Sequence, residues 1–262
     1  MDYARYLCLD ELLTLQRPLS GGGSEPAEHD ETLFIVVHQV YELWFKEILH
    51  EFAHLQRSFE AGDVPRALGT LKRVLTILKV LVSQLDVLET MTPLEFASFR
   101  ERLASGSGLQ SLQFREIEFV LGARDEAALE RFAPGSDARL KLTERLAQPS
   151  LWRSFLGLLA ARGAAIPAGL LAADPALGNA PSEAVQAALL EVYRGDLQAT
   201  LLCERLVDLD EGLQEWRYRH VKMVERTIGT RGGTGGSAGA EYLRTTLFRP
   251  VFEDLWAIRS SL

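Results

Sequence analysis

The chain has 262 residues, of which 47% are hydrophobic, enough for a sizeable buried core, and its formal net charge of −8 argues against a general nucleic-acid binder. The only cysteines, Cys8 and Cys203, exclude a disulfide framework and a CxxC metal pair, so we expect a reducing, cytoplasmic setting. We expect no signal peptide and no membrane span, because no basic start leads into an apolar run and no uncharged apolar run reaches about 18 residues.

Residues 1–28 are predicted to form an N-terminal arm. Apolar side chains at helical spacing between Tyr3 and Leu13 indicate a short amphipathic helix. Pro18 ends this helix, and Gly21–Ser24 is predicted to be a flexible tether. An apolar helix on such a tether is expected to dock on its own body or on another subunit.

From His29 onward, apolar residues recur at helical spacing, and no strand pattern is sustained. Capping and stop residues divide this part into helices. The expected helices are His29 to a turn at 59–63, about 65–90, a short helix opened by the capping box Thr92–Glu95, Gln110–Gly122, and two or three within 124–162.

The last third of the chain is predicted to hold two further helices. After an Ala/Pro/Gly-rich surface loop at 164–181, one helix is expected from Ser182 to Gly229, with a break near 208–210. A closing helix is expected over 242–262. The whole pattern predicts an all-α bundle of long helices, with 1–262 as a single domain.

The segment His50–His54 matches the zinc-peptidase motif HExxH, which places two imidazoles one helical turn apart beside a glutamate. No third ligand follows in the extended pattern, because the chain continues Leu55-Gln56-Arg57. The apolar residues around the motif favour the polar end of an amphipathic helix, so a zinc peptidase is a distant alternative.

The glycine-rich segment 232–239 is predicted to follow a helix, whereas a dinucleotide-binding motif requires a preceding strand. We therefore exclude a nicotinamide site. Such a loop still brings backbone and a hydroxyl close to a small ligand, and Thr234 is its only threonine.

Two histidines stand out by their surroundings. His38 lies in the apolar segment Phe34–Lys46, where a neutral imidazole makes one directed hydrogen bond or binds a metal; a satisfied core histidine is the alternative. His220 lies in a basic, aromatic stretch that suits an anionic cofactor such as haem, against the alternative of a charged helix face. Without CxxCH, haem would be held through one axial imidazole. The basic residues are Arg217, Arg219, Lys222 and Arg226.

Arg100 lies four residues after Phe96 and therefore on the same helix face. The pair suits an aromatic amino acid, with the guanidinium for its carboxylate and the ring for its ring. A surface arginine paired with Glu101 is the alternative.

These residues belong to longer segments that resemble the tryptophan 2,3-dioxygenase family. Phe34–Lys46 is similar to the distal-pocket helix of that family, and Arg219–Gly239 is similar to its haem-ligand helix with the following Gly-Thr-Gly-Gly-Ser loop. The resemblance extends in the same order over nearly the whole chain. Further matching segments are Tyr3–Asp10, Phe99–Arg100, Ser107–Gly108 and Gln110–Arg115.

The resemblance implies an all-α homotetramer with haem b, ferrous in the active form, in each subunit. Its reaction inserts both atoms of O2 across the indole C2–C3 bond of L-tryptophan and gives N-formylkynurenine, as in the kynurenine pathway. L-Tryptophan, O2 and further copies of the chain are then its partners, with no nucleic acid and no membrane.

The resemblance also implies roles for residues. His220 would be the axial iron ligand, and His38 the catalytic residue, hydrogen-bonded to the indole N–H. Arg100 would bind the carboxylate and Thr234 the ammonium group of the substrate. The complete implied substrate-binding set is Phe34, Ile35, Val36, Val37, His38, Phe96, Arg100, Leu103, Ser107, Gly108 and Thr234, with Tyr3 and Tyr6 reaching a neighbouring subunit's site.

Departures from the family pattern keep alternatives open. Leu109 stands in place of a phenylalanine, Ala238 in place of a second serine, and Phe96 in place of the tyrosine of some relatives. The alternatives are a related haem monooxygenase, which would give an oxindole or hydroxylated product from tryptophan or a substituted tryptophan, and a haem-sensing or haem-carrying protein. His38 is either a hydrogen-bond partner or a proton acceptor; the very weak acidity of an indole N–H favours the first.

Overall fold

The computed structural model describes residues 2–21, 26–103, 106, 108–233 and 239–262. Within these ranges every regular element is helical, which confirms the all-α prediction. None of the described helices combines the length and the apolar character needed to cross a membrane.

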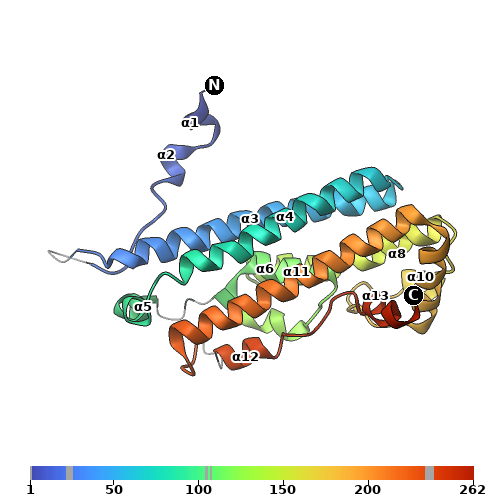
Figure 1. Cartoon of the computed structure of the whole chain (residues 1–262). Helices are drawn as coiled ribbons and strands as arrows, with labels where there is room; N and C mark the ends of the chain where they lie inside the picture. Colours follow the sequence, from blue (N-terminus) through green and yellow to red (C-terminus); the bar gives the residue numbers. More distant parts are fainter. Residues whose placement is uncertain (1, 22–25, 104–105, 107, 234–238) are drawn as a thin grey trace.

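Three long helices form the centre of the molecule: α3 (His29–Glu60), α4 (Val64–Leu88) and α11 (Leu197–Ile228). Gly62, at φ 68°, makes the tight turn between α3 and α4, and the Asp63 side chain caps α4 at the backbone N–H of Arg66. The two helices therefore return antiparallel, and α11 packs along α4 (Figure 1).

Shorter helices surround this centre. Their bounds are α5 Pro93–Arg100, η1 Glu101–Leu103, η2 Gly108–Gln110, α6 Leu112–Leu121, η3 Glu126–Arg131, α7 Asp137–Leu146, α8 Leu151–Ala161, α9 Ala168–Leu171, α10 Glu183–Gly195, α12 Ala240–Arg244, α13 Glu253–Ala257 and η4 Ile258–Ser261. The buried faces of most of them join one large apolar cluster with α3, α4 and α11. Each fully buried leucine or phenylalanine in that cluster contributes about 1.5–3 kcal/mol of burial free energy.

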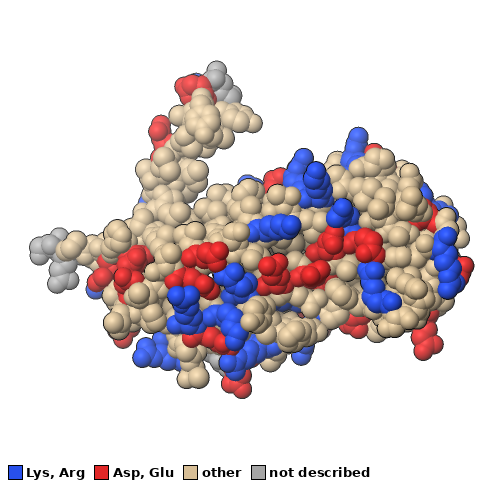
Figure 2. All heavy atoms as spheres, viewed as in Figure 1, with Lys and Arg blue, Asp and Glu red and all other residues tan. Residues whose placement is uncertain are grey.

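The N-terminal arm carries two single-turn helices, α1 (Tyr3–Tyr6) and α2 (Leu9–Leu12), and extends away from the bundle (Figure 1). Its base is fixed to α3, where the buried Glu31 carboxylate accepts from the backbone N–H groups of Leu19 (2.7 Å) and Ser20 (2.8 Å). Most of the arm's surface is neither acidic nor basic (Figure 2).

Two sequence predictions in the C-terminal third are wrong. The expected helix from Ser182 to Gly229 breaks at Asp196, not at 208–210, because Asp196 leaves the helical conformation and caps α11 at the N–H of Ala199. Asp210 instead lies inside α11 and is fully buried.

The expected closing helix over 242–262 is divided into α12, α13 and η4. Pro250 lacks a backbone N–H, and the N–H groups of Val251 and Phe252 donate to the Asp210 carboxylate at 2.9 and 3.0 Å instead of to a helix. The Trp256 indole donates to the same oxygen at 3.0 Å, so Asp210 holds the C-terminal segment against α11.

Candidate functional site

Several of the predicted site residues lie where α5 contacts both α3 and α11, at the end of the bundle that carries the arm (Figure 1). The capping box of Thr92 and Glu95, with Pro93 in the first turn, starts α5. From this start, the spacing of Phe96, Phe99 and Arg100 gives the short helix one aromatic face and ends it on the arginine.

Three phenylalanines form a compact aromatic cluster. Ring centroids lie 5.7 Å apart for Phe34 and Phe96, 5.6 Å for Phe34 and Phe99, and 5.5 Å for Phe96 and Phe99. The imidazole of His38 lies against it, 4.1 Å from the Phe34 ring. Phe34 and Phe96 belong to the predicted substrate-binding set, whereas Phe99, which follows Phe96 at helical spacing, does not.

The His38 imidazole has a defined tautomer. Its Nδ1 lies 2.7 Å from the backbone oxygen of Phe34, and since a carbonyl only accepts, Nδ1 carries the proton and donates. Nε2 is then left with a lone pair that accepts a hydrogen bond. Burial lowers the pKa of His38 below its ordinary value, so the ring is neutral at pH 7.

His220 lies on α11, and its imidazole stacks against the ring of Trp216. The two ring centroids are 5.1 Å apart, and the ring planes differ by 7°. Burial, with a smaller contribution from His38 as a second potential positive charge, lowers the pKa of His220 to about 4. A neutral imidazole in apolar surroundings keeps a lone pair free to bind a metal. The sequence predicts a role for His220 but none for Trp216.

The basic residues around His220 do not form the expected free basic rim. Arg219 pairs with Asp86 at 2.6 Å and Arg226 with Glu89 at 3.4 Å, both across to the C-terminal end of α4. Arg217 is buried and pairs with Glu118 of α6, and Lys222 pairs with Glu225. The acids that pair with these cations lie either far away in the sequence or on the same helix, so the basic stretch alone does not reveal them.

Arg115 is buried, and its guanidinium is incompletely paired. Its Nη1 lies 2.5 Å from a Glu118 oxygen, but its Nε has no hydrogen-bond partner. The guanidinium lies over the ring of Phe114, and Phe114 packs 4.9 Å from Trp216, so Arg115 is linked to His220 through two rings.

Arg100 joins α5 to the glycine-rich loop. Its Nη2 donates to the backbone oxygen of Gly232 at 2.5 Å. The described ends of this loop lie together, because a Cβ added at Gly239 would lie 2.7 Å from the oxygen of Arg231. Thr234 and Ser107 lie outside the described residues.

The structure does not bring every predicted substrate-binding residue to one surface. On α3, Val37 is buried, Ile35 is half-buried and Val36 is 39% exposed, because successive side chains point in different directions around the helix. Leu103 is half-buried on η1, and Gly108 is exposed at the start of η2. Tyr3 and Tyr6 are 74% and 72% exposed on the arm.

The HExxH segment lies inside α3, which continues to Glu60, rather than at a helix end. Glu51 is buried and pairs with Arg73 at 2.6 Å, whereas His50 is exposed. Across the described part of the chain, no group of three or more His, Cys, Asp or Glu side chains is arranged to hold a metal ion. Neither observation supports a zinc peptidase.

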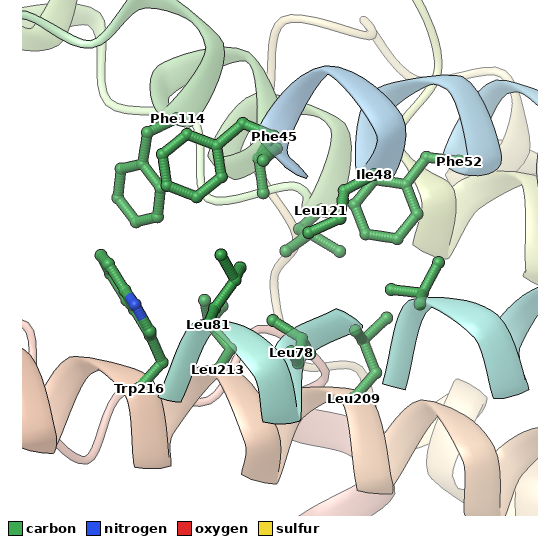
Figure 3. Close-up of a pocket in the computed structure, with 12 residues that line it drawn as sticks. Phe45, Ile48, Phe52, Leu78, Leu81, Phe114, Leu121, Leu209, Leu213 and Trp216 are labelled. Atoms are coloured by element: carbon green, nitrogen blue, oxygen red, sulfur yellow. The ribbon is translucent and has the colours of Figure 1, made fainter. Parts of the chain in front are cut away.

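A small apolar cavity lies beside the site rather than in it. Its volume is about 20 Å³, and Phe45, Phe114 and Trp216 lie together at one end of it (Figure 3). Neither His38 nor His220 lines it.

Comparisons with known proteins give one consistent result. The family model described as Tryptophan 2,3-dioxygenase matches residues 1–150 and 179–262, which leaves out α8 and α9. Proteins named tryptophan 2,3-dioxygenase are similar over 100% of this chain. They include those of Anaeromyxobacter sp. (strain K), 59% identical over 96% of its length, Herpetosiphon aurantiacus, 56% over 98%, and Caulobacter vibrioides, 45% over 98%.

Proposed function

Since this chain belongs to the tryptophan 2,3-dioxygenase family and is an oxidoreductase of that family, we propose that it opens the indole ring of L-tryptophan with dioxygen. The reaction joins one O2 to the C2–C3 bond and gives N-formylkynurenine. All atoms of both substrates are retained, so no external reductant is consumed in the turnover. The observation that carries this proposal is the presence of two buried, neutral imidazoles, one on α3 beside an aromatic cluster and one on α11, with an arginine on the neighbouring α5.

The residues fit a haem cofactor held by His220. The imidazole is neutral and buried, which suits an axial ligand, and the unpaired Arg115 Nε offers a donor for an acidic group of the porphyrin. Haem bound there would supply the site that binds and activates dioxygen.

The side chains of the chain itself orient the amino acid. Phe34, Phe96 and Phe99 offer apolar surface to an indole ring and exclude water from it. His38 Nε2, which carries no proton, would accept a hydrogen bond from the indole N–H. Arg100 would bind the carboxylate through its guanidinium, and Thr234 the ammonium group.

His38 acts in this proposal by positioning rather than by removing a proton. An indole N–H is a far weaker acid than a protonated imidazole, so transfer to His38 is strongly unfavourable. A hydrogen bond to Nε2 still fixes the plane of the ring and raises electron density at C3.

The arm supports assembly with other copies of the chain. Tyr3 and Tyr6 are largely exposed, whereas the base of the arm is fixed on α3 by Glu31, so the aromatic tip is held away from its own subunit. We infer a homotetramer in the cytoplasm, where Cys8 and Cys203 stay reduced, with each arm contributing to a neighbouring site.

Absorption spectra and product mass test the proposal together. The haem-loaded ferrous protein is expected to show a Soret band that shifts on adding L-tryptophan, and turnover under ¹⁸O2 is expected to add two labelled atoms to the product. One labelled atom would indicate the related monooxygenase, and haem binding without turnover would indicate a haem carrier. Absence of a haem band after reconstitution would overturn the proposal.

A further inference from the structure

Two reciprocal hydrogen bonds join α3 and α4 directly beside His38. The Tyr41 hydroxyl donates to the backbone oxygen of Leu81 at 2.6 Å, and the Gln84 amide donates to the backbone oxygen of Val37 at 2.9 Å. One bond runs from α3 to α4, and the other returns from α4 to α3 about one helical turn away. Val37 immediately precedes His38, so the second bond acts on the backbone that carries the imidazole.

These two bonds fix the position of α3 along the axis of α4. Both acceptors are mid-helix carbonyls, which accept a second donor with the lone pair that the helix does not use. A slide by one residue, about 1.5 Å, would move both donors away from their acceptors. Apolar contacts between the two helices depend less on such a slide, so polar pairs of this kind specify one arrangement.

The same end of α4 is tied to the helix of His220. Arg219, the residue before His220, pairs with Asp86 at 2.6 Å and with Glu89 at 3.6 Å. Closer to the N-terminal ends of α11 and α4, a Cβ added at Gly212 would lie 3.3 Å from the Leu78 side chain, so the two helices approach each other closely. The C-terminal end of α4 therefore holds both histidine-bearing helices in place.

We propose that Gln84 and Tyr41 are positioning residues. By fixing α3 along α4, they set the position of the His38 imidazole relative to the indole ring of the substrate. This inference rests on the proposed function, in which His38 Nε2 receives the indole N–H. Hydrogen-bond lengths between nitrogen atoms vary by only a few tenths of an ångström around about 3 Å, so a displacement of one residue along the helix exceeds what this bond tolerates.

Gln84→Met tests the proposal, since methionine has a similar length and lacks the donor. Gln56→Met is the matched control, because the Gln56 amide donates to the backbone oxygen of Pro149 at 3.0 Å from the opposite end of α3. Two readouts are compared: tryptophan affinity and turnover of the haem-loaded protein, and the imidazole ¹⁵N resonances of the haem-free protein, which has five histidines.

Gln84→Met is expected to weaken tryptophan binding about tenfold, the effect of one buried hydrogen bond, and to shift the His38 resonances. Gln56→Met is expected to change neither, at a similar thermal midpoint. Tyr41→Phe should act in the same direction, and the double variant should lose less affinity than the sum of the two, because both bonds control one displacement.

If Gln84→Met and Gln56→Met give the same tryptophan affinity and turnover and the same His38 resonances, the proposal is overturned. Where Gln84→Met does not fold, Tyr41→Phe is compared with the control in the same way. A wild-type protein that does not turn over tryptophan would refute the proposed function alone, since the His38 resonances of the variants still decide whether Gln84 and Tyr41 position the imidazole.

Discussion

The hydrogen bond assigned to His38 Nε2 can be measured by changing both of its partners. His38→Ala removes the acceptor, and a tryptophan analogue with sulfur in place of the indole N–H removes the donor. Because His38 Nδ1 is committed to the Phe34 oxygen at 2.7 Å, Nε2 is the one ring atom that can accept from the substrate. Leaving a buried N–H without an acceptor costs about 1–3 kcal/mol, which corresponds to about 5- to 150-fold in Kd.

The four dissociation constants form a thermodynamic cycle, obtained by Soret titration of the haem-loaded protein. The wild type is expected to prefer tryptophan over the sulfur analogue by this factor, and His38→Ala is expected to lose the preference while it still binds both. A coupling free energy of about 1 kcal/mol or more supports the assigned bond. Equal losses of affinity for the two ligands would refute the reasoning and make His38 a packing residue.

Three further predictions follow from the described contacts. Arg100→Lys loses the guanidinium fork and should weaken tryptophan binding about 10- to 100-fold, whereas tryptamine, which lacks the carboxylate, should bind equally to both proteins in the same titration. Burial lowers the pKa of His38, so tryptophan affinity should be constant from pH 8 to about 6.5. Affinity should fall only at lower pH, because protonation removes the Nε2 lone pair. A decline that begins above pH 7 would contradict this prediction. Asp210→Ala leaves two backbone N–H groups and one indole N–H without their acceptor, at about 1–3 kcal/mol each, so its thermal midpoint should fall well below that of Asp210→Asn, which retains an oxygen acceptor; equal midpoints in calorimetry would show that these bonds do not stabilise the fold.

Local sequence signals predict the α5 part of the site well. The capping box at Thr92 and the spacing of Phe96 and Arg100 are enough to place a ring and a cation on one face of a helix, as observed. The apolar segment around His38 also predicts its helix and its burial. These features depend on neighbours within one or two helical turns.

Contacts between distant residues set the features that the sequence analysis missed. The acidic segment at 208–210 looks like a helix break, and only the N–H of Val251, 41 residues later, shows why Asp210 stays within α11. The basic residues near His220 look like a free rim until Asp86, 133 residues before Arg219, is placed beside it. Helical spacing likewise predicts which residues share a face but not which partner helix that face meets, so it did not single out Gln84.

The position of Asp210 has a consequence for the order in which the protein folds during synthesis. Its carboxylate lies in the middle of α11, whereas its donors, Val251, Phe252 and Trp256, are made 41, 42 and 46 residues later. A nascent chain that has completed α11 therefore holds a carboxylate that cannot be buried favourably until residues 251–256 have left the ribosome. We expect the final packing of α11 to wait for this segment, and chains that terminate before Val251 should remain targets for proteolysis.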